Sequence, residues 1–374
     1  MALTILSYDS LRKQVETASK GLNTVHYTAL GQPSYFYVMA AFNDSVGGAL
    51  HPAFNLANRA GSGNTAKGEL FFGQYQGCLR NGELLSLPGV APLVSTNHDN
   101  FVNYANACNG GSASGFHLAN NVEWNAAQQM VLTQGFQPNG NTDYGRSSDN
   151  NTERGVAATG ANAGRLAAAS GTVTNAVLTG SGPNSWRTGN SPFGIADLNG
   201  NVWEWSPGMR VNSGEINLIS FDGTTAANPA QAITADLHAT TGKWYAIDGA
   251  TGALVAATLG TPVAGSVRYA AAASGTADFT LYRNSGGSFE GMVNSTGANP
   301  VGATALALVK AHGLYPITTG LGSDAFYLNV ADERCPLRGG AWGGSANAGV
   351  FFLNCDTARS AAGVGIGGRL ALIL

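Results

Sequence analysis

The sequence predicts a loop-rich α+β fold with long insertions, and three observations support this prediction. Short β-prone segments, such as residues 34–41 and 69–75, are separated by long stretches rich in Gly, Asn, Ser and Thr. Apolar residues recur at helical spacing in only a few segments. Charged residues make up 11% of the chain, below the about 25% of typical globular proteins, whereas the hydrophobic share of 44% is enough to fill a core.

Helical patterns are predicted at three places in the first third of the chain, residues 9–21, 97–108 and 121–132. For the first of these helices, Asp9 or Ser10 is the expected N-terminal cap. An asparagine also precedes the third segment, and an acidic residue lies in its first turn. A mostly antiparallel, twisted sheet system with two of these helices packed on it is therefore expected.

Three strands are predicted around the densest motifs of the chain. The turn Asn199-Gly200 precedes the alternating segment Val202–Trp205, which is typical of a strand. Two further strands are expected near the C-terminus, at Ala348–Leu353 and Ile366–Leu374.

A length of 374 residues suits one large domain, which we assign to residues 46–374. Residues 1–45 are expected either to dock on that domain or to belong to it. Residues 137–192 read as a long surface loop. Residues 206–330 read as an insertion that contains three short strands (Glu215–Phe221, Trp244–Ile247, Phe279–Tyr282) and a helix, Ala303–Gly313.

Composition argues against several partners. The net charge is −3 and no run of Lys or Arg is present, so no binding to nucleic acid is expected. No apolar stretch reaches the ~18 residues that cross a bilayer. The segment Met1–Tyr8 is apolar but short and has no basic start, so it does not read as a secretory signal. Synthesis in a cytoplasm is expected, with display on a virion or cell surface reached by another route, such as assembly into a particle.

Cysteine spacing favours free thiols. The four cysteines, Cys78, Cys108, Cys335 and Cys355, form no CxxC pair. Free cysteine behaves as a small hydrophobic residue, so four mostly buried thiols are predicted. One disulfide remains an open alternative.

Five segments then match a known family in order along the chain. They are HPAF from His51, ELFFGQY from Glu69, FHLANNVEWNAA from Phe116, GIADLNGNVWEW from Gly194, and LRGGAW…ARS…IGGR from Leu337 to Arg369. This order resembles the formylglycine-generating-enzyme/sulfatase-modifying superfamily, whose members have a C-type lectin-like fold. Within it, the chain is most similar to the variable proteins of diversity-generating retroelements, which occur in phages, bacteria and archaeal viruses.

The resemblance implies a receptor- or adhesin-like protein whose C-terminal surface is diversified. In that family a reverse transcriptase copies a template with errors at adenines, and the copy replaces the 3′ end of the gene. A variable region of about 338–370 is implied here, with hypervariable ligand-binding positions in two groups. They are Ala341, Gly343, Gly344, Ser345, Ala346, Phe352, Cys355, Asp356 and Thr357, followed by Ala361, Ala362, Gly363, Val364, Gly365 and Gly368.

Two details of this segment bear on the resemblance. Residues 343–368 contain no Lys, Glu, Gln, Met or Trp, which mutated Asn codons do not yield. Gly368 departs from the family, which usually has an aromatic residue at this position. Phe352, if it points outward, is the strongest single contact candidate, because an exposed aromatic ring offers contact area at little cost in entropy.

Between the variable positions, the resemblance implies a fixed scaffold, made of Arg338, Gly339, Gly340, Trp342, Asn347–Phe351, Arg359 and Arg369. At least two of the three arginines are expected to satisfy buried carbonyls, or the acids Glu204 and Asp197. Trp203, Trp205 and Trp342 are expected in the core. His51 and His117 are expected to be structural.

An enzyme of the same superfamily is the first alternative. Those enzymes use a pair of reactive cysteines, the first directly after the Trp of RGG-small-Trp, where this chain has Gly343. Thiol chemistry requires a thiolate, so we predict no enzyme and no catalytic residue. The six histidines include none in residues 334–374, which disfavours a histidine-rich iron site.

The second alternative is a structural virion protein without a ligand, in which residues 341–368 are buried in an assembly. No cofactor is expected, although a structural Ca²⁺ ion held with the help of Asn199 and Asn201 is left open beside the favoured role of these residues in the turn. The expected partner is an unknown protein or glycan, and a monomer is favoured.

Overall fold

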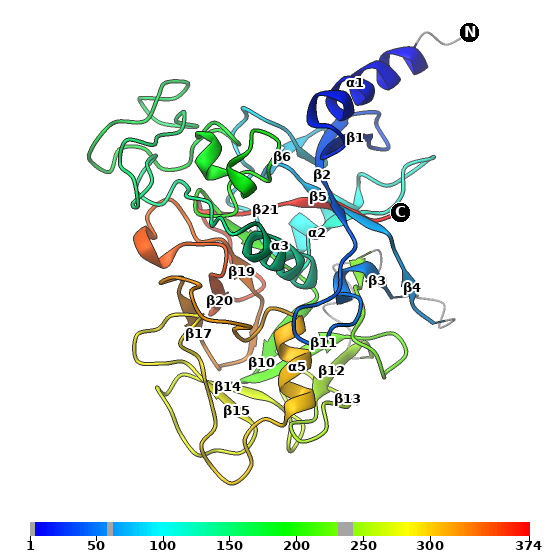
Figure 1. Ribbon diagram of the computed structural model, residues 1–374, viewed down its shortest axis with the longest axis vertical. Coiled ribbons are helices and arrows are strands. Elements are labelled where there is room, and N and C mark those ends of the chain that lie inside the picture. Colours follow the sequence, from blue (N-terminus) through cyan, green and yellow to red (C-terminus); the bar gives the residue numbers. More distant parts are fainter. Residues whose placement is uncertain (1–3, 58–62, 231–241) are drawn as a thin grey trace.

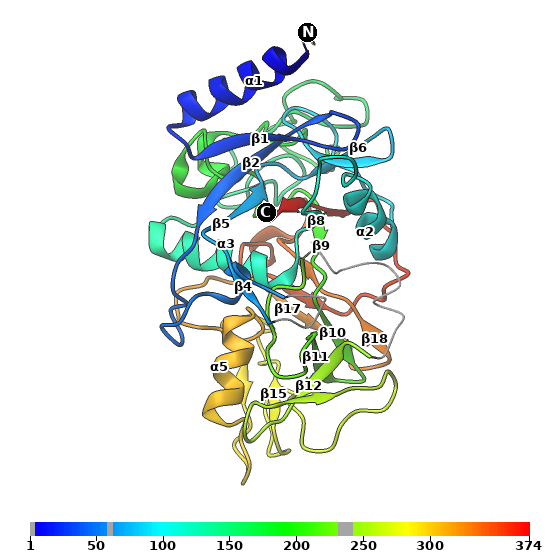
Figure 2. The ribbon, with the colours of Figure 1, turned by 90° about the vertical axis from the view of Figure 1, so that its right-hand side faces the viewer.

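A computed structural model describes residues 4–57, 63–230 and 242–374. It shows a mixed α+β architecture in which two five-stranded sheets lie between a protruding N-terminal helix at one end and a helix with an eight-stranded sheet at the other (Figures 1 and 2). Among the described residues, no helix combines the length and apolarity needed to cross a bilayer.

The first sheet joins both ends of the chain. All its neighbouring strands run antiparallel. In spatial order they are β1 (Asn23–Tyr27), β2 (Pro33–Ala40), β5 (Glu69–Gly73), β22 (Leu370–Leu372) and β8 (Phe116–Leu118). The N-terminal strands therefore share one sheet with the last strand of the chain.

Helix α1 (Thr4–Ser19) precedes this sheet and begins earlier than the sequence predicted. Asp9 and Ser10 lie inside the helix, so their expected role as N-cap is wrong. The helix ends near the predicted place, because Gly21 has a left-handed φ of 83° and its N–H donates to Glu16 O at 2.8 Å.

Helices α2 (His98–Asn106) and α3 (Asn121–Gln134) confirm the other two helix predictions. Asn97 caps α2 by accepting from Asn100 N. Asn120 caps α3, and Glu123 reaches back to Asn120 N at 3.0 Å, which makes a reciprocal capping box. Nearly every turn of α3 is buried, so this helix lies at the centre of the molecule (Figure 1).

The predicted insertion folds into the second sheet and helix α5 (Ala303–Ala311). The main path of the sheet is β13 (Leu254–Ala256), β12 (Trp244–Ile247), β11 (Glu215–Ile219), β14 (Arg268–Ala270), β15 (Thr280–Tyr282) and β16 (Val293–Asn294). Off this path, β10 (Met209–Asn212) pairs with both β11 and β18 (Glu333–Arg334). The predicted strands and helix of this region are confirmed, with shifts of a few residues at their ends.

The third sheet carries the C-terminal motifs. In spatial order its strands are β17 (Phe326–Leu328), β20 (Leu353–Cys355), β19 (Leu337–Arg338), β9 (Trp203–Trp205) and β21 (Ile366–Gly368). β19 runs antiparallel to both β20 and β9, whereas β17–β20 and β9–β21 are parallel pairs. The predicted strand at 202–205 is thus confirmed as β9, which lies between β19 and β21.

Two C-terminal strand predictions need correction. Residues 348–352 form a turn, in which Phe352 N donates to Gly349 O at 3.1 Å, and the strand begins only at Leu353. The apolar run therefore reflects a buried turn, not an extended segment. The predicted strand 366–374 is divided at Arg369, because β21 and β22 belong to different sheets.

The remaining elements are short. Two hairpins pair β3 (Asn55–Leu56) with β4 (Thr65–Ala66) and β6 (Gly77–Arg80) with β7 (Glu83–Ser86). Three-residue 3-10 turns lie at η1 (Pro52–Phe54), η2 (Asn184–Trp186), η3 (Thr188–Asn190) and η5 (Ser345–Asn347). Within 137–192 only η2 and η3 are regular, which confirms the long loop.

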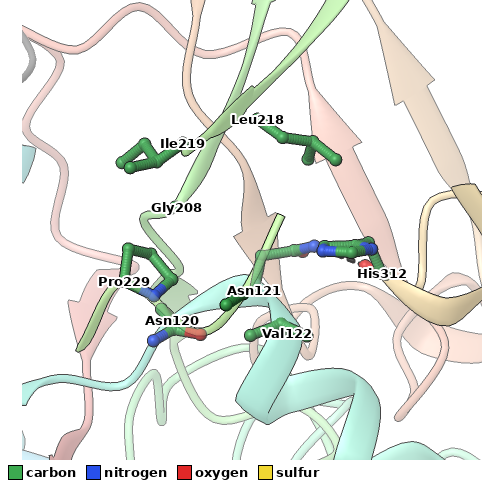
Figure 3. Close-up of a pocket in the computed structure, with 9 residues that line it drawn as sticks. Asn120, Asn121, Val122, Gly208, Leu218, Ile219, Pro229 and His312 are labelled. Atoms are coloured by element: carbon green, nitrogen blue, oxygen red, sulfur yellow. Dashed lines mark hydrogen bonds between the residues drawn. The ribbon is translucent and has the colours of Figure 1, made fainter. Parts of the chain in front are cut away.

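The insertion is docked onto the start of α3. Figure 3 shows Asn120 and Asn121 beside Leu218 and Ile219 of β11, with His312 at the end of α5. The cavity between them measures only about 10 Å³, so the contact is close-packed. Amide groups join the parts as well, since Asn121 Nδ2 donates to His312 O at 2.5 Å.

We expect the two helix caps to differ in their contribution to stability. Asn97→Ala removes one exposed cap hydrogen bond and should lower the free energy of unfolding by about 1 kcal/mol. Asn120→Ala should cost about 2 kcal/mol or more, because it also removes the buried 2.7 Å bond to Asn228 Oδ1. Urea denaturation of both variants measures the difference. Equal losses would contradict this account of α3.

Candidate functional site

The C-terminal segment is anchored by Arg369, which is fully buried between the first and third sheets. Its guanidinium makes a two-point ion pair with Glu204, with Nη2–Oε1 at 2.6 Å and Nε–Oε2 at 2.9 Å. The same group donates to Gly73 O at 2.9 Å and to Ala196 O at 3.0 Å. The predicted structural role of Arg369 is confirmed.

Arg338 is also fully buried but has a neutral partner. Its Nη2 donates to Asn121 Oδ1 at 2.6 Å and to Gly313 O at 2.7 Å. Burial lowers the pKa of Arg338 to about 10, so it keeps its charge at neutral pH. Arg338 therefore connects β19, α3 and the end of α5 in the insertion, and its predicted structural role is confirmed.

Arg359 differs from the other two arginines because it lies near the surface. Its Nη1 lies 3.3 Å from Asp99 Oδ2 and its Nε lies 3.1 Å from Glu333 Oε2. These contacts hold the turn before the second variable group against α2 and β18.

Behind the Asn199-Gly200 turn, a single amide brings four oxygens together. Nε2 of the buried Gln76 lies 2.9 Å from Glu204 Oε1 and 3.0 Å from Val202 O. It also lies 3.4 Å from Gly200 O and 3.3 Å from Asp197 O. Sequence reasoning missed Gln76, although a glutamine directly after an apolar strand was the available signal.

Asn201 has no free oxygen to offer to the Ca²⁺ ion that was left open. Asn201 Oδ1 already accepts from Val177 N at 2.8 Å and from Asn141 Nδ2 at 3.1 Å, which uses both of its lone pairs. Its Nδ2 donates to Gln76 Oε1 at 2.8 Å. Asn201 therefore stabilises the turn, and in the described part of the chain no group of three or more His, Cys, Asp or Glu is placed to hold a metal.

Most of the predicted variable positions lie at the surface. Six of them are exposed, namely Gly343, Ser345, Ala346, Asp356, Ala362 and Val364. Four more are half-buried, namely Gly344, Thr357, Ala361 and Gly363. Five are buried, namely Ala341, Phe352, Cys355, Gly365 and Gly368.

Phe352 and Cys355 cannot be the outward contacts that were predicted. Phe352 is only 2% exposed, and its ring stacks on Trp203 with centroids 6.5 Å apart and lies edge-on to Tyr327. Cys355 is fully buried in β20, and burial raises the pKa of its thiol to about 12. Both positions were assigned outward from the family resemblance alone, which does not show how side chains pack in this chain.

Gly368 belongs to the scaffold. A Cβ atom at this position would lie 2.9 Å from Phe101 Cδ1 and 3.0 Å from Leu118 Cδ1, which is too close for any larger residue without repacking. The packed core at Phe101 and Leu118 therefore accounts for glycine at this position.

Residues of both predicted groups line one hollow, which we call the C-terminal hollow: Ala341, Gly343 and Gly344 from the first group, and Gly363, Val364 and Gly365 from the second. Its volume is about 460 Å³. It is lined by Trp203, Tyr327, Ala341, Trp342, Gly343, Gly344, Asn347, Gly363, Val364, Gly365 and Ile366. Residues from both variable groups thus share one site, although they are separated along the chain by β20.

The walls of the C-terminal hollow include residues that sequence reasoning placed elsewhere. Trp203 and Trp342 are half-buried and line it, whereas Trp205 alone of the three is in the core as predicted. Asn347 was assigned to the scaffold but is exposed. Tyr327 was missed, because nothing in the sequence indicates that β17 lies beside β20.

A second, more polar hollow of about 290 Å³ lies beside the first variable group and is lined by Asp149, Asn199, Asp324 and Ala346, among others. Asp324 Oδ2 accepts from Phe351 N at 2.6 Å, so this carboxyl group holds the turn 348–352. Burial raises the pKa of Asp324 to about 8, and the carboxylate of Asp149 adds to that rise.

The thiol and histidine predictions agree with the structure. All four cysteines are free and buried. His117 Nε2 lies 2.7 Å from Glu123 Oε1, and His51 Nε2 lies 2.9 Å from Asn125 Oδ1, so both rings have buried structural partners.

Comparison with known proteins finds similarity among solved structures alone. The sequence matches no protein-family model and no curated protein. Among solved structures, the chain is similar to Treponema denticola variable protein 1, with 12% sequence identity and a TM-score of 0.32. The alignment covers 94% of this chain and 99% of that protein.

Glu204→Gln should lower the free energy of unfolding by about 3–5 kcal/mol, because it leaves the buried Arg369 without a counter-charge. The matched control is Asp99→Asn, which removes a carboxylate of similar shape from the more exposed pair with Arg359 and should cost about 1 kcal/mol or less. Chemical denaturation of both variants measures the contrast. A small loss for Glu204→Gln would refute the anchoring role.

Asp324 should make stability fall as pH rises from about 5 to about 7.5. The unfolded carboxyl ionises near 3.8 and the folded one near 8, so the folded chain binds the extra proton in this window. Asp324→Asn removes this titration. As pH rises through the window, the free energy of unfolding of the variant should therefore increase relative to that of the parent protein, by at most about 1.4 kcal/mol per pH unit.

The control for this titration is Asp248→Asn. Hydrogen bonds from Thr251 lower the pKa of Asp248, so this half-buried group titrates below the window. Thermal denaturation over the pH range compares the three proteins, and parallel curves for all of them would show that Asp324 does not titrate as expected.

Proposed function

We propose that this protein binds a ligand through the C-terminal hollow, and that a diversity-generating retroelement varies the residues around it. The proposal includes a C-type lectin-like fold, a receptor- or adhesin-like role and a protein or glycan as partner. The observation that carries it is the placement of the variable positions: two groups that are separated along the chain line one surface hollow.

The scaffold residues supply the second support. A surface can accept many substitutions only if the backbone beneath it is held by groups outside the varied set. Arg338 and Arg369 are fully buried and hold the strands on either side of the exposed residues through hydrogen bonds to backbone carbonyls, Asn121 and Glu204. Ala346, Ala362 and Val364 are exposed, and a Cβ atom at Gly363 would make only ordinary contacts, so substitutions at these positions disturb little of the packing.

A non-catalytic role is part of the proposal. The position after Trp342 carries glycine, and the next thiol along the chain, Cys355, is buried with its pKa raised to about 12. A thiol with such a pKa is not a nucleophile at neutral pH. The alternative of a thiol-dependent enzyme is therefore disfavoured on chemical grounds.

Sequencing of the gene's 3′ end from many clones of one lineage tests the proposal. We expect differences only where a neighbouring template copy has adenine, concentrated in codons 343–346, 356–357 and 361–365, while codons 338, 352, 355, 368 and 369 stay constant. An upstream segment of the same gene is the control and should not vary. Differences spread evenly along the gene, or no differences beside an active reverse transcriptase gene, would refute diversification.

A further inference from the structure

Gly365 lies against the edge of the Trp342 indole. A Cβ atom at position 365 would lie 2.9 Å from both Cη2 and Cζ3 of that ring, closer than carbon atoms approach without displacement. Its backbone φ is not in the left-handed region, so the backbone itself accepts other residues. The restriction on position 365 is therefore steric and comes from one side chain.

The backbone on both sides of this contact is held in place. Trp203 N donates to Gly365 O at 2.8 Å. Trp342 N donates to Asn201 O at 3.1 Å, and Trp342 O accepts from Tyr144 N at 2.7 Å. Because neither main chain is free to retreat, a larger residue at 365 can be accommodated only by rotation of the Trp342 side chain. That side chain is half-buried and lines the hollow, so its rotation changes the shape of the site.

The lining also indicates what the hollow takes. Apart from the phenol of Tyr327, the residues that line it carry no ionisable group, and Asn347 is the one amide side chain among them. A charged or hydroxyl-rich group would lose hydration there without enough replacement hydrogen bonds. A flat apolar ring would instead bury area against the indoles of Trp203 and Trp342.

Resting on the proposed function, we propose that the C-terminal hollow takes an aromatic side chain of a protein ligand, and that Gly365 determines specificity by fixing where the Trp342 indole lies. Glycine at 365 keeps the hollow in its present shape. Any larger residue at that position, including those that diversification introduces, moves the indole and changes which side chains fit. Gly365 is thus a positioning residue that acts through Trp342.

Gly363 provides a matched control in the same segment. It lines the same hollow, and a Cβ atom there would make ordinary contacts, 3.4 Å from Ile366 Cδ1. Its φ is also outside the left-handed region. Gly363→Ala and Gly365→Ala therefore add the same methyl group to the same site, but only the second displaces the indole.

Fluorine NMR of protein labelled with 5-fluorotryptophan separates these cases. The chain has six tryptophans, and Trp342→Phe assigns the resonance of Trp342. We expect Gly365→Ala to shift that resonance and Gly363→Ala to leave it in place. Titration with N-acetyl-L-tryptophanamide should perturb the resonances of Trp203 and Trp342 in the parent protein. Binding should be about tenfold weaker in Gly365→Ala than in Gly363→Ala, because only the first change displaces the indole.

Each other result overturns a defined part of the proposal. An unmoved Trp342 resonance in Gly365→Ala would refute the positioning role. The aromatic ligand would be refuted if methyl glucoside, and not the tryptophan amide, perturbed the resonances of Trp203 and Trp342. It would also be refuted if neither probe perturbed them. Should Gly365→Ala fold poorly, the double variant Trp342→Ala/Gly365→Ala must be as stable as Trp342→Ala alone. None of these readouts depends on gene diversification, so the proposed function can fail independently in the sequencing test.

Discussion

The ion pair between Arg369 and Glu204 is the interaction on which the rest of the structure depends. It lies where the first and third sheets meet, and it divides the last strand of the chain into β21 and β22. A buried guanidinium is stable only when its donors are satisfied, and here Glu204, Gly73 and Ala196 satisfy them. Strand β9 with Glu204, the end of β5 at Gly73 and the segment at Ala196 are consequently held in one arrangement.

Because this ion pair is buried, exposed residues on the neighbouring surface can be substituted without removing it. The exposed residues of 343–346 and 361–364 are mostly Gly, Ala and Ser, and their main chains are held by bonds to neighbouring segments. The stabilising contacts are thus concentrated in buried arginines and amides. The exposed side chains of the proposed binding site make few contacts with the core. Gly365 is the position where the two roles meet, because it is buried against a tryptophan that lines the hollow.

The insertion contributes to the same site. Its sheet and α5 pack against the start of α3, and Arg338 joins Asn121 of α3 to Gly313 O at the end of the insertion. Near the C-terminal end of the insertion, β17 places Tyr327 beside Phe352 and the C-terminal hollow. A segment that looked like an addition to the fold therefore supports one wall of the site.

The sequence by itself determined the α+β class, the helices at 98–106 and 121–134 and the strands of the insertion, because local spacing and capping residues carry that information. The structural roles of Arg338 and Arg369 were expected from the resemblance and from the need of a buried guanidinium for acceptors. Only the tertiary structure decided which variable positions face outward. Phe352 and Cys355 are buried because residues 348–352 form a turn. That turn depends on Asp324 and β17, which lie twenty residues or more earlier in the sequence. Local pattern cannot encode such contacts, since they arise from the packing of segments that meet only in the folded chain.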